Sequence, residues 1–285
     1  MIIKRNFDLS SISYINVGGK TKEYIEIENV IELLNLPSEF IAIGNTSKIL
    51  FAFDYIDKAI VKFNVSKIIY FKNSYFVYSG AKNSIVYAEL KNKGISGFEY
   101  ISTIPGLVGG SIVNNASFLV QSISDNLIKV LVYENGKFKW LSKSDCNFKY
   151  RKTSLNKENF LIVGAMFKKV YLDIQDIEKK HKEAIMYRKN HQNEYINTLG
   201  STFVNEDNFV IGKVLDELGY KGFRYSNNVK ISQKHANFIV VNNKTHYLEI
   251  YSFIDYLKRL LYYYLKKNIS LEINVITKDG KQRDT

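Results

Sequence analysis

The stretch YISTIPGLVGGSIVNNASF, residues 100–118, contains three glycines, two asparagines and one of the two prolines of the chain. Glycine accepts positive φ and leaves backbone N–H groups uncovered, so such a stretch turns a corner or lets the backbone approach a ligand. A second small-residue loop, Gly44–Lys48, follows the apolar run FIAI. Neither loop has the glycine spacing of a phosphate loop or of a dinucleotide-binding motif. Together they indicate a ligand site made of backbone loops, without a P-loop or Rossmann unit.

Composition and charge restrict the class of protein. The chain has 285 residues, 46% of them hydrophobic, which is enough for two domains with cores of their own. No apolar run approaches the roughly 18 residues of a membrane span, and the first residues do not read as a secretory signal. The single cysteine, Cys146, excludes an internal disulfide and favours a reducing, cytoplasmic setting. The net charge of +12 is spread along the chain, which suits a site for a phosphorylated small molecule better than a nucleic acid.

The pattern of apolar residues predicts an α+β protein. Short runs rich in Ile, Phe and Val predict strands through the first 172 residues, with hairpins at 67–80 and around Asn135–Gly136 and a helix at 84–94. From residue 173 onward, charged and amphipathic helices alternate with strands. We expect helices from 173, over 207–219 and over 245–268, the last with Thr245 as its N-cap, and strands over 235–242 and 270–277.

Segments along nearly the whole chain resemble one protein family, in the same order. IPGLVGGSIVNNAS (104–117) resembles the Ile-Pro-Gly-x-Val-Gly-Gly-Ala…Asn-Ala-Gly stretch of the UDP-N-acetylenolpyruvoylglucosamine reductases, the MurB family. KHANFIVVN (234–242) resembles the family's Lys-His-Ala-Asn-Phe-Ile-Val stretch, and both matches are long enough to be specific. Further matches are VGGK at 17–20, IGNTSKILF at 43–51, FKYRKTSL at 148–155, LGSTFVN at 199–205, IGKVLDELGYKGFR at 211–224 and LEINVI at 271–276. The size of the chain resembles the shorter, second type of this family.

The resemblance implies a fold and a reaction. The fold is a two-lobed FAD-binding module of the PCMH or vanillyl-alcohol-oxidase type, followed by a smaller α/β substrate-binding domain. We place lobe 1 at 1–62, lobe 2 at 63–172 and the substrate domain at 173–285. The reaction is the FAD-dependent, NADPH-driven reduction of UDP-N-acetylenolpyruvoylglucosamine to UDP-N-acetylmuramate for peptidoglycan. The protein is expected to act on this UDP-sugar as a cytoplasmic monomer, with no nucleic acid, membrane or metal.

The chemistry of this reaction requires a cation and a proton donor. Hydride addition to an enolpyruvyl ether leaves negative charge on the carbon beside the substrate carboxylate. By the resemblance, Arg151 pairs with the carboxylate, Ser201 donates the proton and Glu272 helps to polarise the enol. Without the family, these residues read as a surface arginine, a turn serine and a solvent-facing glutamate.

The other site residues are also assigned by the resemblance. Lys221 and Arg224 suit a diphosphate because cations are its usual partners, whereas a lone histidine such as His235 is more often structural. For the substrate we expect Tyr150, Asn205, Lys221, Arg224 and His235. For FAD we expect Gly44, Asn45, Thr46, Ser47, Ile104, Pro105, Gly106, Gly109, Gly110, Asn114, Ala116 and Ile162.

The chain departs from the family motifs at some of these positions. Thr46 and Lys48 stand where the first loop has glycine and asparagine, and Ser117 stands where the second has glycine. Because several departures fall at predicted flavin contacts, two alternatives stay open. One is a FAD oxidoreductase of the same fold with another substrate. The other is a basic nucleotide- or nucleic-acid-binding protein without flavin.

Overall fold

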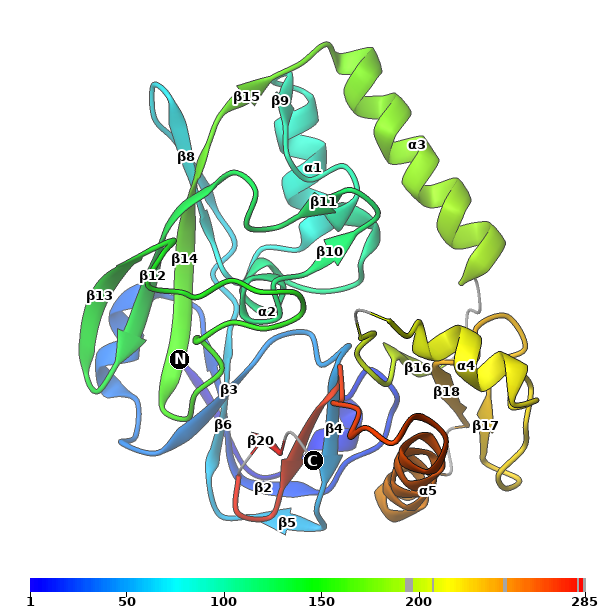
Figure 1. The fold of residues 1–285 in the computed structure, drawn as a ribbon. Coiled ribbons are helices and arrows are strands. Elements are labelled where there is room, and N and C mark those ends of the chain that lie inside the picture. Colours follow the sequence, from blue (N-terminus) through cyan, green and yellow to red (C-terminus); the bar gives the residue numbers. More distant parts are fainter. Residues whose placement is uncertain (193–196, 207, 243–244, 281, 284–285) are drawn as a thin grey trace. The chain divides into compact units, whose positions relative to one another are not determined.

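The computed structural model describes residues 1–192, 197–206, 208–242, 245–280 and 282–283, and Figure 1 labels their elements. This described part of the chain divides into two compact units. Unit 1 comprises Met1–Arg5, Glu23–Asn45 and Lys58–Arg188, and unit 2 comprises Asn6–Lys22, Thr46–Asp57 and Lys189–Thr285. Each unit thus combines segments that are far apart in sequence. The ranges 1–62, 63–172 and 173–285 stay a prediction for the two lobes and the substrate domain.

The central sheet of unit 1 is antiparallel, with β14 between β12 and β8 (Figure 1). Phe160 and Ile162 of β14 pack into one apolar cluster, and Leu161 and Val163 pack into another. Because successive side chains of a strand point to opposite faces, β14 is buried on both of them. The strands, in their order across the sheet, are β13 (Lys137–Ser142), β12 (Leu127–Glu134), β14 (Phe160–Lys168), β8 (Ser74–Tyr78) and β7 (Ile68–Tyr70).

A set of parallel strands and short helices completes unit 1. β2 (Lys20–Ile27) pairs in parallel with β6 (Ala59–Phe63), which pairs in parallel with β3 (Phe40–Ile43). β1 (Ile2–Asp8), β2 and α3 (Ile174–His191) contribute residues to both units. The remaining elements are η2 (Val30–Asn35), α1 (Asn83–Lys91), β9 (Ile95–Ser96), η3 (Ile101–Thr103), α2 (Val108–Val113), β10 (Ser117–Phe118), β11 (Gln121–Ser122) and β15 (Val170–Tyr171).

The predicted hairpins of unit 1 are confirmed. β7 pairs antiparallel with β8, and β12 pairs antiparallel with β13, with Glu134 opposite Lys137. Asn135 and Gly136 between them have φ of 50° and 75°. Positive φ at both central residues is what a two-residue turn between twisted strands requires. The helix predicted at 84–94 is confirmed as α1.

Unit 2 has a hydrophobic core of its own around α5 (Tyr247–Leu265). Ile250, Phe253, Ile254, Leu257 and Leu261 form a buried stripe at helical spacing. Two sheets contribute to this core, β16-β18-β17 and β20-β19-β4, and β19 pairs with β4 in parallel. The other elements are η1 (Leu9–Ser11), β4 (Ile49–Ala52), β5 (Tyr55–Ile56), β16 (Thr198–Ser201), α4 (Ile211–Glu217), β17 (Val229–Ile231), β18 (Phe238–Val241), β19 (Asn274–Thr277) and β20 (Gln282–Arg283).

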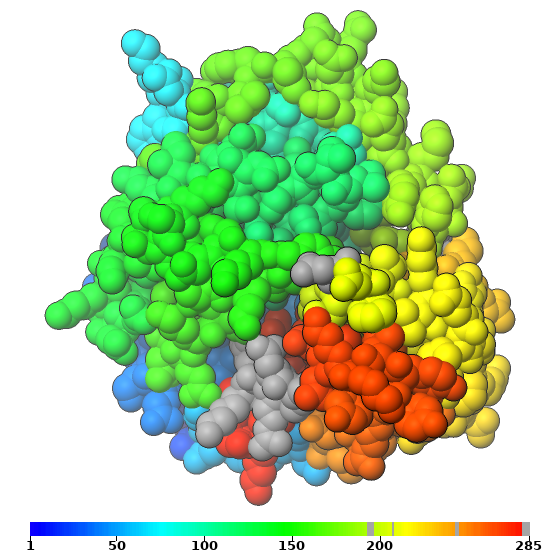
Figure 2. All heavy atoms as spheres, viewed as in Figure 1, coloured from blue at the N-terminus to red at the C-terminus, as the bar shows by residue number. Residues whose placement is uncertain are grey.

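The outer face of α5 is exposed and aromatic. Tyr262, Tyr263 and Tyr264 near its carboxyl end are more than half exposed. The segment that contains this end of the helix is orange in Figure 2. The helix is therefore amphipathic. Within the described ranges, no helix is long and apolar enough to cross a membrane.

The helices and strands predicted after residue 173 are confirmed with shorter bounds, and residue 207 lies outside the described residues. The prediction of Thr245 as the N-cap of α5 is wrong, because the N-cap is His246. His246 Nδ1 accepts a hydrogen bond from Leu248 N (3.3 Å). The Thr245 hydroxyl instead donates to Asn242 O (2.8 Å), in the preceding turn.

Gly164 in β14 is required by close packing. A Cβ at this position would lie 2.4 Å from Phe76 Cζ and 2.6 Å from Val77 O. We expect Gly164→Ala to lower the free energy of unfolding by about 3 kcal/mol, because the backbone of β8 must move. Urea unfolding measures this change.

Gly110→Ala is the matched control, because a Cβ there meets no heavy atom within 4 Å. Gly110 lies in α2, where alanine is the better helix former. Equal stability of the two variants would contradict the packing assigned to Gly164.

Candidate functional site

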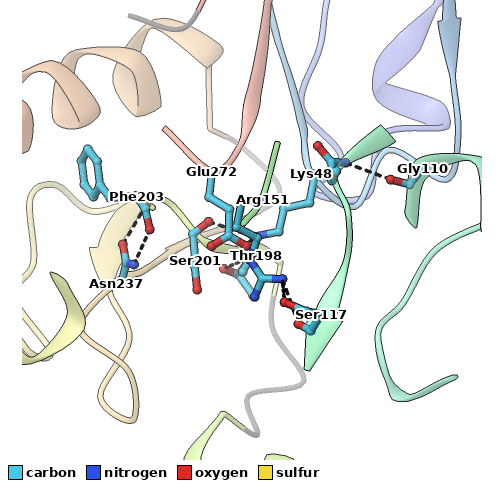
Figure 3. A network of polar contacts seen from close by, with 11 residues as sticks. Lys48, Gly110, Ser117, Arg151, Thr198, Ser201, Phe203, Asn237 and Glu272 are labelled. Carbon is cyan, nitrogen blue, oxygen red and sulfur yellow. Dashed lines mark hydrogen bonds and ion pairs between the residues drawn. The ribbon is translucent and has the colours of Figure 1, made fainter. Parts of the chain in front are cut away.

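Backbone pairing in unit 2 places Ser201 beside Glu272 (Figure 3). Thr202, which follows Ser201, donates its N–H to Asn237 O, and its carbonyl accepts from Glu272 N, both at 2.8 Å. The Glu272 amide therefore bonds to the residue directly after Ser201. Two of the residues predicted as catalytic thus lie on adjacent stretches of backbone.

Asn237 fixes the stretch that follows Ser201. Its side-chain amide donates to Phe203 O (2.8 Å), and its Oδ1 accepts from Phe203 N (2.9 Å) (Figure 3). Asn237 is buried, and these bonds satisfy its amide. No role was predicted for Asn237 from the sequence. Its position directly before a buried apolar strand could have indicated a structural role for its polar side chain.

Lys48 lies between Ser201 and Glu272 and was not predicted as a site residue. Its Nζ is 2.8 Å from Glu272 Oε1 and donates to Ser201 O at 2.9 Å. The side chains of Lys48 and Glu272 are 26% and 12% exposed, so solvent screens this ion pair less than a surface pair. Gly200 has φ of 73°, and a Cβ there would lie 3.3 Å from Lys48 Nζ. A side chain at this position would therefore crowd the ammonium group.

His235 lies within electrostatic reach of Glu272 and Lys48. Burial lowers the pKa of His235 below its ordinary value; Lys48 and Lys221 lower it as well, whereas Glu272 raises it. Its Nδ1 accepts a hydrogen bond from Asn237 N (3.3 Å). A ring that accepts at Nδ1 is neutral and carries its proton on Nε2.

The other predicted substrate residues of unit 2 have local partners. Asn205 Oδ1 accepts from Ile211 N (3.0 Å) at the start of α4. Lys221 Nζ pairs with Asp216 at 2.7 Å, and both side chains are exposed. Arg224 is also exposed. Lys221 and Arg224 are therefore accessible to an anion from solvent, whereas Asn205 already takes part in the local structure.

Thr46 adopts a left-handed backbone conformation of the kind that favours glycine. Its φ is 54°, which is strained for a β-branched residue. Its Oγ1 accepts from Tyr14 N (2.8 Å) and donates to Ile12 O (3.0 Å), both within unit 2. Ser47 follows in a turn closed by a hydrogen bond from Ile49 N to Thr46 O. The hydroxyl contacts offset the strain, so this departure preserves the loop.

Arg151 of unit 1 lies in a tight turn. Lys149 and Lys152 exchange backbone hydrogen bonds, and Arg151 between them has φ of 55°. Its Nη1 donates to Ser117 O (2.8 Å) and to Ser117 Oγ (2.9 Å) (Figure 3). Its guanidinium carbon lies 5.2 Å from the centroid of the Tyr150 ring. Ser117 and Tyr150 therefore orient the guanidinium group. Ser117, like Thr46, is a position where the chain departs from the family motif.

The two glycine loops predicted to bind FAD meet within unit 1. A Cβ on Gly44 would lie 4.0 Å from Gly110 N, and a Cβ on Gly110 would meet no heavy atom within 4 Å. Gly109 donates its N–H to Ser79 O (2.9 Å), and a Cβ on it would lie 2.9 Å from Ser79 Cβ. Gly109 is therefore needed for packing, whereas Gly110 faces open space.

Asn83 holds the proline-containing part of the loop and was missed by the sequence analysis. Its side chain donates to Ser111 Oγ (2.9 Å) and to Ile104 O (3.4 Å). Its backbone N–H donates to Gly106 O (3.3 Å), on the other side of Pro105. Asn83 is buried, so it fixes the loop from inside unit 1.

The remaining predicted FAD residues also lie in unit 1. Asn114 ends α2 and donates its side-chain amide to Gly110 O (3.0 Å). Ala116 donates its N–H to Ser111 O (2.8 Å), and Ile162 is buried in β14. Asn45 is the last residue of its segment of unit 1. Within the described part of the chain, no group of histidine, cysteine and acidic side chains is suited to hold a metal.

The lowered pKa of His235 predicts a loss of stability in acid. Unfolded histidine titrates near pH 6.5, and the folded pKa lies lower, so between these values the unfolded state binds more protons. The free energy of unfolding therefore falls as the pH falls below about 6.5. We expect His235→Gln to lose less stability than the parent between pH 7.5 and 5.0, measured by urea unfolding.

His191→Gln is the control, because His191 is exposed at the end of α3. It should keep the pH dependence of the parent. A parent-like pH dependence of His235→Gln would show that His235 is not the group responsible.

Comparison with known proteins identifies relatives over the whole chain. Residues 188–276 match the family described as UDP-N-acetylenolpyruvoylglucosamine reductase, C-terminal domain. The UDP-N-acetylenolpyruvoylglucosamine reductase of Fusobacterium nucleatum is 28% identical over 268 residues, 91% of this chain and 94% of that protein. The protein of the same name from Prochlorococcus marinus subsp. pastoris is 29% identical, over 95% of each chain.

A solved structure shares the fold. The crystal structure of UDP-N-acetylenolpyruvylglucosamine reductase (MurB) from Thermus caldophilus matches with a TM-score of 0.85 and 23% identity. The match covers 96% of this chain and 99% of that one. This match confirms the predicted fold class, and the matches to the family model and to the relatives in sequence confirm the resemblance to that family.

Proposed function

We propose that this chain, a member of the UDP-N-acetylenolpyruvoylglucosamine reductase family, reduces UDP-N-acetylenolpyruvoylglucosamine to UDP-N-acetylmuramate in peptidoglycan precursor synthesis. FAD is the cofactor and NADPH the reductant. The observation that carries the proposal is the cluster in unit 2 where the Ser201 and Glu272 backbones are joined through Thr202. The proposed reaction uses Ser201 as the proton donor and Glu272 as a carboxylate that helps to polarise the enol.

The glycine loops of unit 1 fit a bound cofactor. Gly44 approaches Gly110, and the space in front of Gly110 holds no protein atom within 4 Å of an added Cβ. Uncovered backbone at such loops suits close contact with a polar, phosphate-containing group. We assign this role to Gly44, Asn45, Ile104, Pro105, Gly106, Gly109, Gly110, Asn114 and Ala116 of unit 1 and to Ile162 of β14. By the family resemblance we also assign Thr46 and Ser47, which belong to unit 2, to FAD.

The proposed reaction adds a hydride and a proton across the enolpyruvyl double bond. A bound flavin supplies the hydride from its N5. Arg151 pairs with the substrate carboxylate and stabilises the negative charge that develops beside it. Ser201 Oγ then gives its proton to the carbon next to the carboxylate, and Glu272 helps to polarise the enol.

The nucleotide part of the substrate requires cations. Lys221 and Arg224 are exposed and carry positive charge, so we assign them to the diphosphate. Tyr150, Asn205 and His235 complete the proposed substrate contacts. We place the enzyme in the cytoplasm as a monomer that acts on this UDP-sugar, with no nucleic-acid or membrane partner.

Ser201→Ala separates the two halves of the reaction. The variant should bleach the flavin with NADPH at the parent rate, since no substrate proton is transferred in that half. Reoxidation by UDP-N-acetylenolpyruvoylglucosamine should slow by about 100-fold or more, the scale of a lost general acid. Stopped-flow absorbance measures both.

Ser252→Ala, on the exposed face of α5, is the matched control and should behave as the parent. Parent-like reoxidation by Ser201→Ala would exclude Ser201 as the proton donor. A yellow protein that NADPH bleaches but this substrate never reoxidises would favour a related flavin oxidoreductase with another substrate. A colourless protein that does not take up FAD would favour the alternative without flavin.

Gly110→Ala tests the cofactor site without disturbing the fold. Its methyl group meets no protein atom within 4 Å, so the variant should keep parental stability. We expect FAD affinity to fall at least tenfold, because the methyl group enters the space assigned to the cofactor. Fluorescence titration of the FAD-free protein measures the Kd, and unchanged affinity would reject this placement.

A further inference from the structure

Lys48 joins three segments of unit 2 at one ammonium group. Its Nζ contacts Glu272 Oε1 at 2.8 Å and Ser201 O at 2.9 Å. These acceptors lie at the end of β16 and just before β19, whereas Lys48 directly precedes β4. A single cation therefore bonds to both residues of this unit that are proposed as catalytic.

The backbone of Lys48 is fixed next to the segment that carries Glu272. Lys48 O accepts a hydrogen bond from Asn274 N (2.7 Å), and the parallel register continues with Ile49 opposite Asn274. The lysine side chain thus starts from a defined position close to its carboxylate partner. Less backbone entropy is lost on pairing than for a lysine in a mobile loop.

The Ser201 side of the contact is equally restrained. Ser201 O accepts the lysine proton, and the next carbonyl, of Thr202, accepts from Glu272 N. Gly200 leaves room for the lysine, since a Cβ there would lie 3.3 Å from Nζ and 3.7 Å from Cε. The ammonium group therefore restrains both the Ser201 peptide and the Glu272 carboxylate.

Partial burial gives this ion pair more effect than a surface pair. The Glu272 side chain is 12% exposed, so its carboxylate depends on a counter-charge within the protein. Loss of Lys48 removes this counter-charge from the Glu272 carboxylate. His235 experiences both charges, because Glu272 raises its pKa and Lys48 lowers it.

We propose that Lys48 is a positioning residue, which holds the Glu272 carboxylate and the Ser201 peptide in the arrangement that proton delivery to the substrate requires. The inference rests on the proposed function for its catalytic consequence. The contact itself does not depend on that function, and it can be tested separately.

The first measurement follows His235 and is independent of activity. The chain has four histidines, so NMR titration of their ring protons is tractable, and His235→Gln identifies the resonance. Lys48→Met should raise the pKa of His235, since it removes a nearby positive charge, and Glu272→Gln should lower it. An unchanged pKa in Lys48→Met would show that Lys48 does not occupy this cluster, and would overturn the inference.

The second measurement compares the two half-reactions. Lys48→Met should slow reoxidation of the reduced enzyme by UDP-N-acetylenolpyruvoylglucosamine at least tenfold, while bleaching by NADPH stays within twofold of the parent. Lys48→Arg, which keeps a cation, should recover most of the lost rate. Parent-like reoxidation in Lys48→Met, or no recovery in Lys48→Arg, would overturn the positioning role.

The control is an ion pair of the same length in the same unit. Arg259 and Asp255 of α5 are 2.8 Å apart, with side chains 81% and 51% exposed. Arg259→Met should leave the His235 pKa and both half-reactions unchanged. If the parent itself is never reoxidised by this substrate, the proposed function fails, and the His235 titration alone then decides whether Lys48 makes the contact.

Discussion

The hydrogen bond from Glu272 N to Thr202 O is the contact on which the arrangement of unit 2 depends. It joins the segment that leads into β19 to the residue that follows Ser201, although seventy residues of sequence separate the two. The Asn237 side chain fixes Phe203, the next residue of that stretch, and Lys48 adds an ion pair and a second hydrogen bond. Each later contact requires the backbones to be adjacent already, because a side-chain hydrogen bond is effective over a narrow range of distance.

Positive φ recurs where the loops of the site turn. Gly200, Thr46 and Arg151 all have φ between 54° and 73°, a conformation that is costly for residues with a Cβ. The structure offsets the cost locally in each non-glycine case. Thr46 makes hydroxyl bonds to residues 12 and 14, and Arg151 bonds to Ser117. Such strain is retained when surrounding contacts determine the backbone.

The departures from the family motifs have physical explanations in the structure. Thr46 takes a positive φ that glycine adopts readily, Lys48 pairs with Glu272, and Ser117 accepts a hydrogen bond from Arg151. Several of the departures were expected to fall at flavin contacts, and Thr46 is among the residues predicted to bind FAD. In the fold, Thr46 bonds to Ile12 and Tyr14, while Lys48 and Ser117 bond to residues predicted as catalytic. A motif comparison records which residue is missing, but it does not show which partner the replacement acquires.

The amino-acid sequence by itself determined the local elements, because hairpin turns such as Asn135–Gly136 and the stripe of α5 depend on neighbours close in the chain. It also indicated the family resemblance, through ordered motifs that carry Arg151, Ser201 and Glu272. Tertiary structure alone decided the composition of the units, the burial of Asn83 and Asn237, and the pairing of Lys48 with Glu272. These features join residues up to 224 positions apart in sequence. Such contacts form only when distant segments of backbone pair, and a local pattern of residues does not encode that pairing.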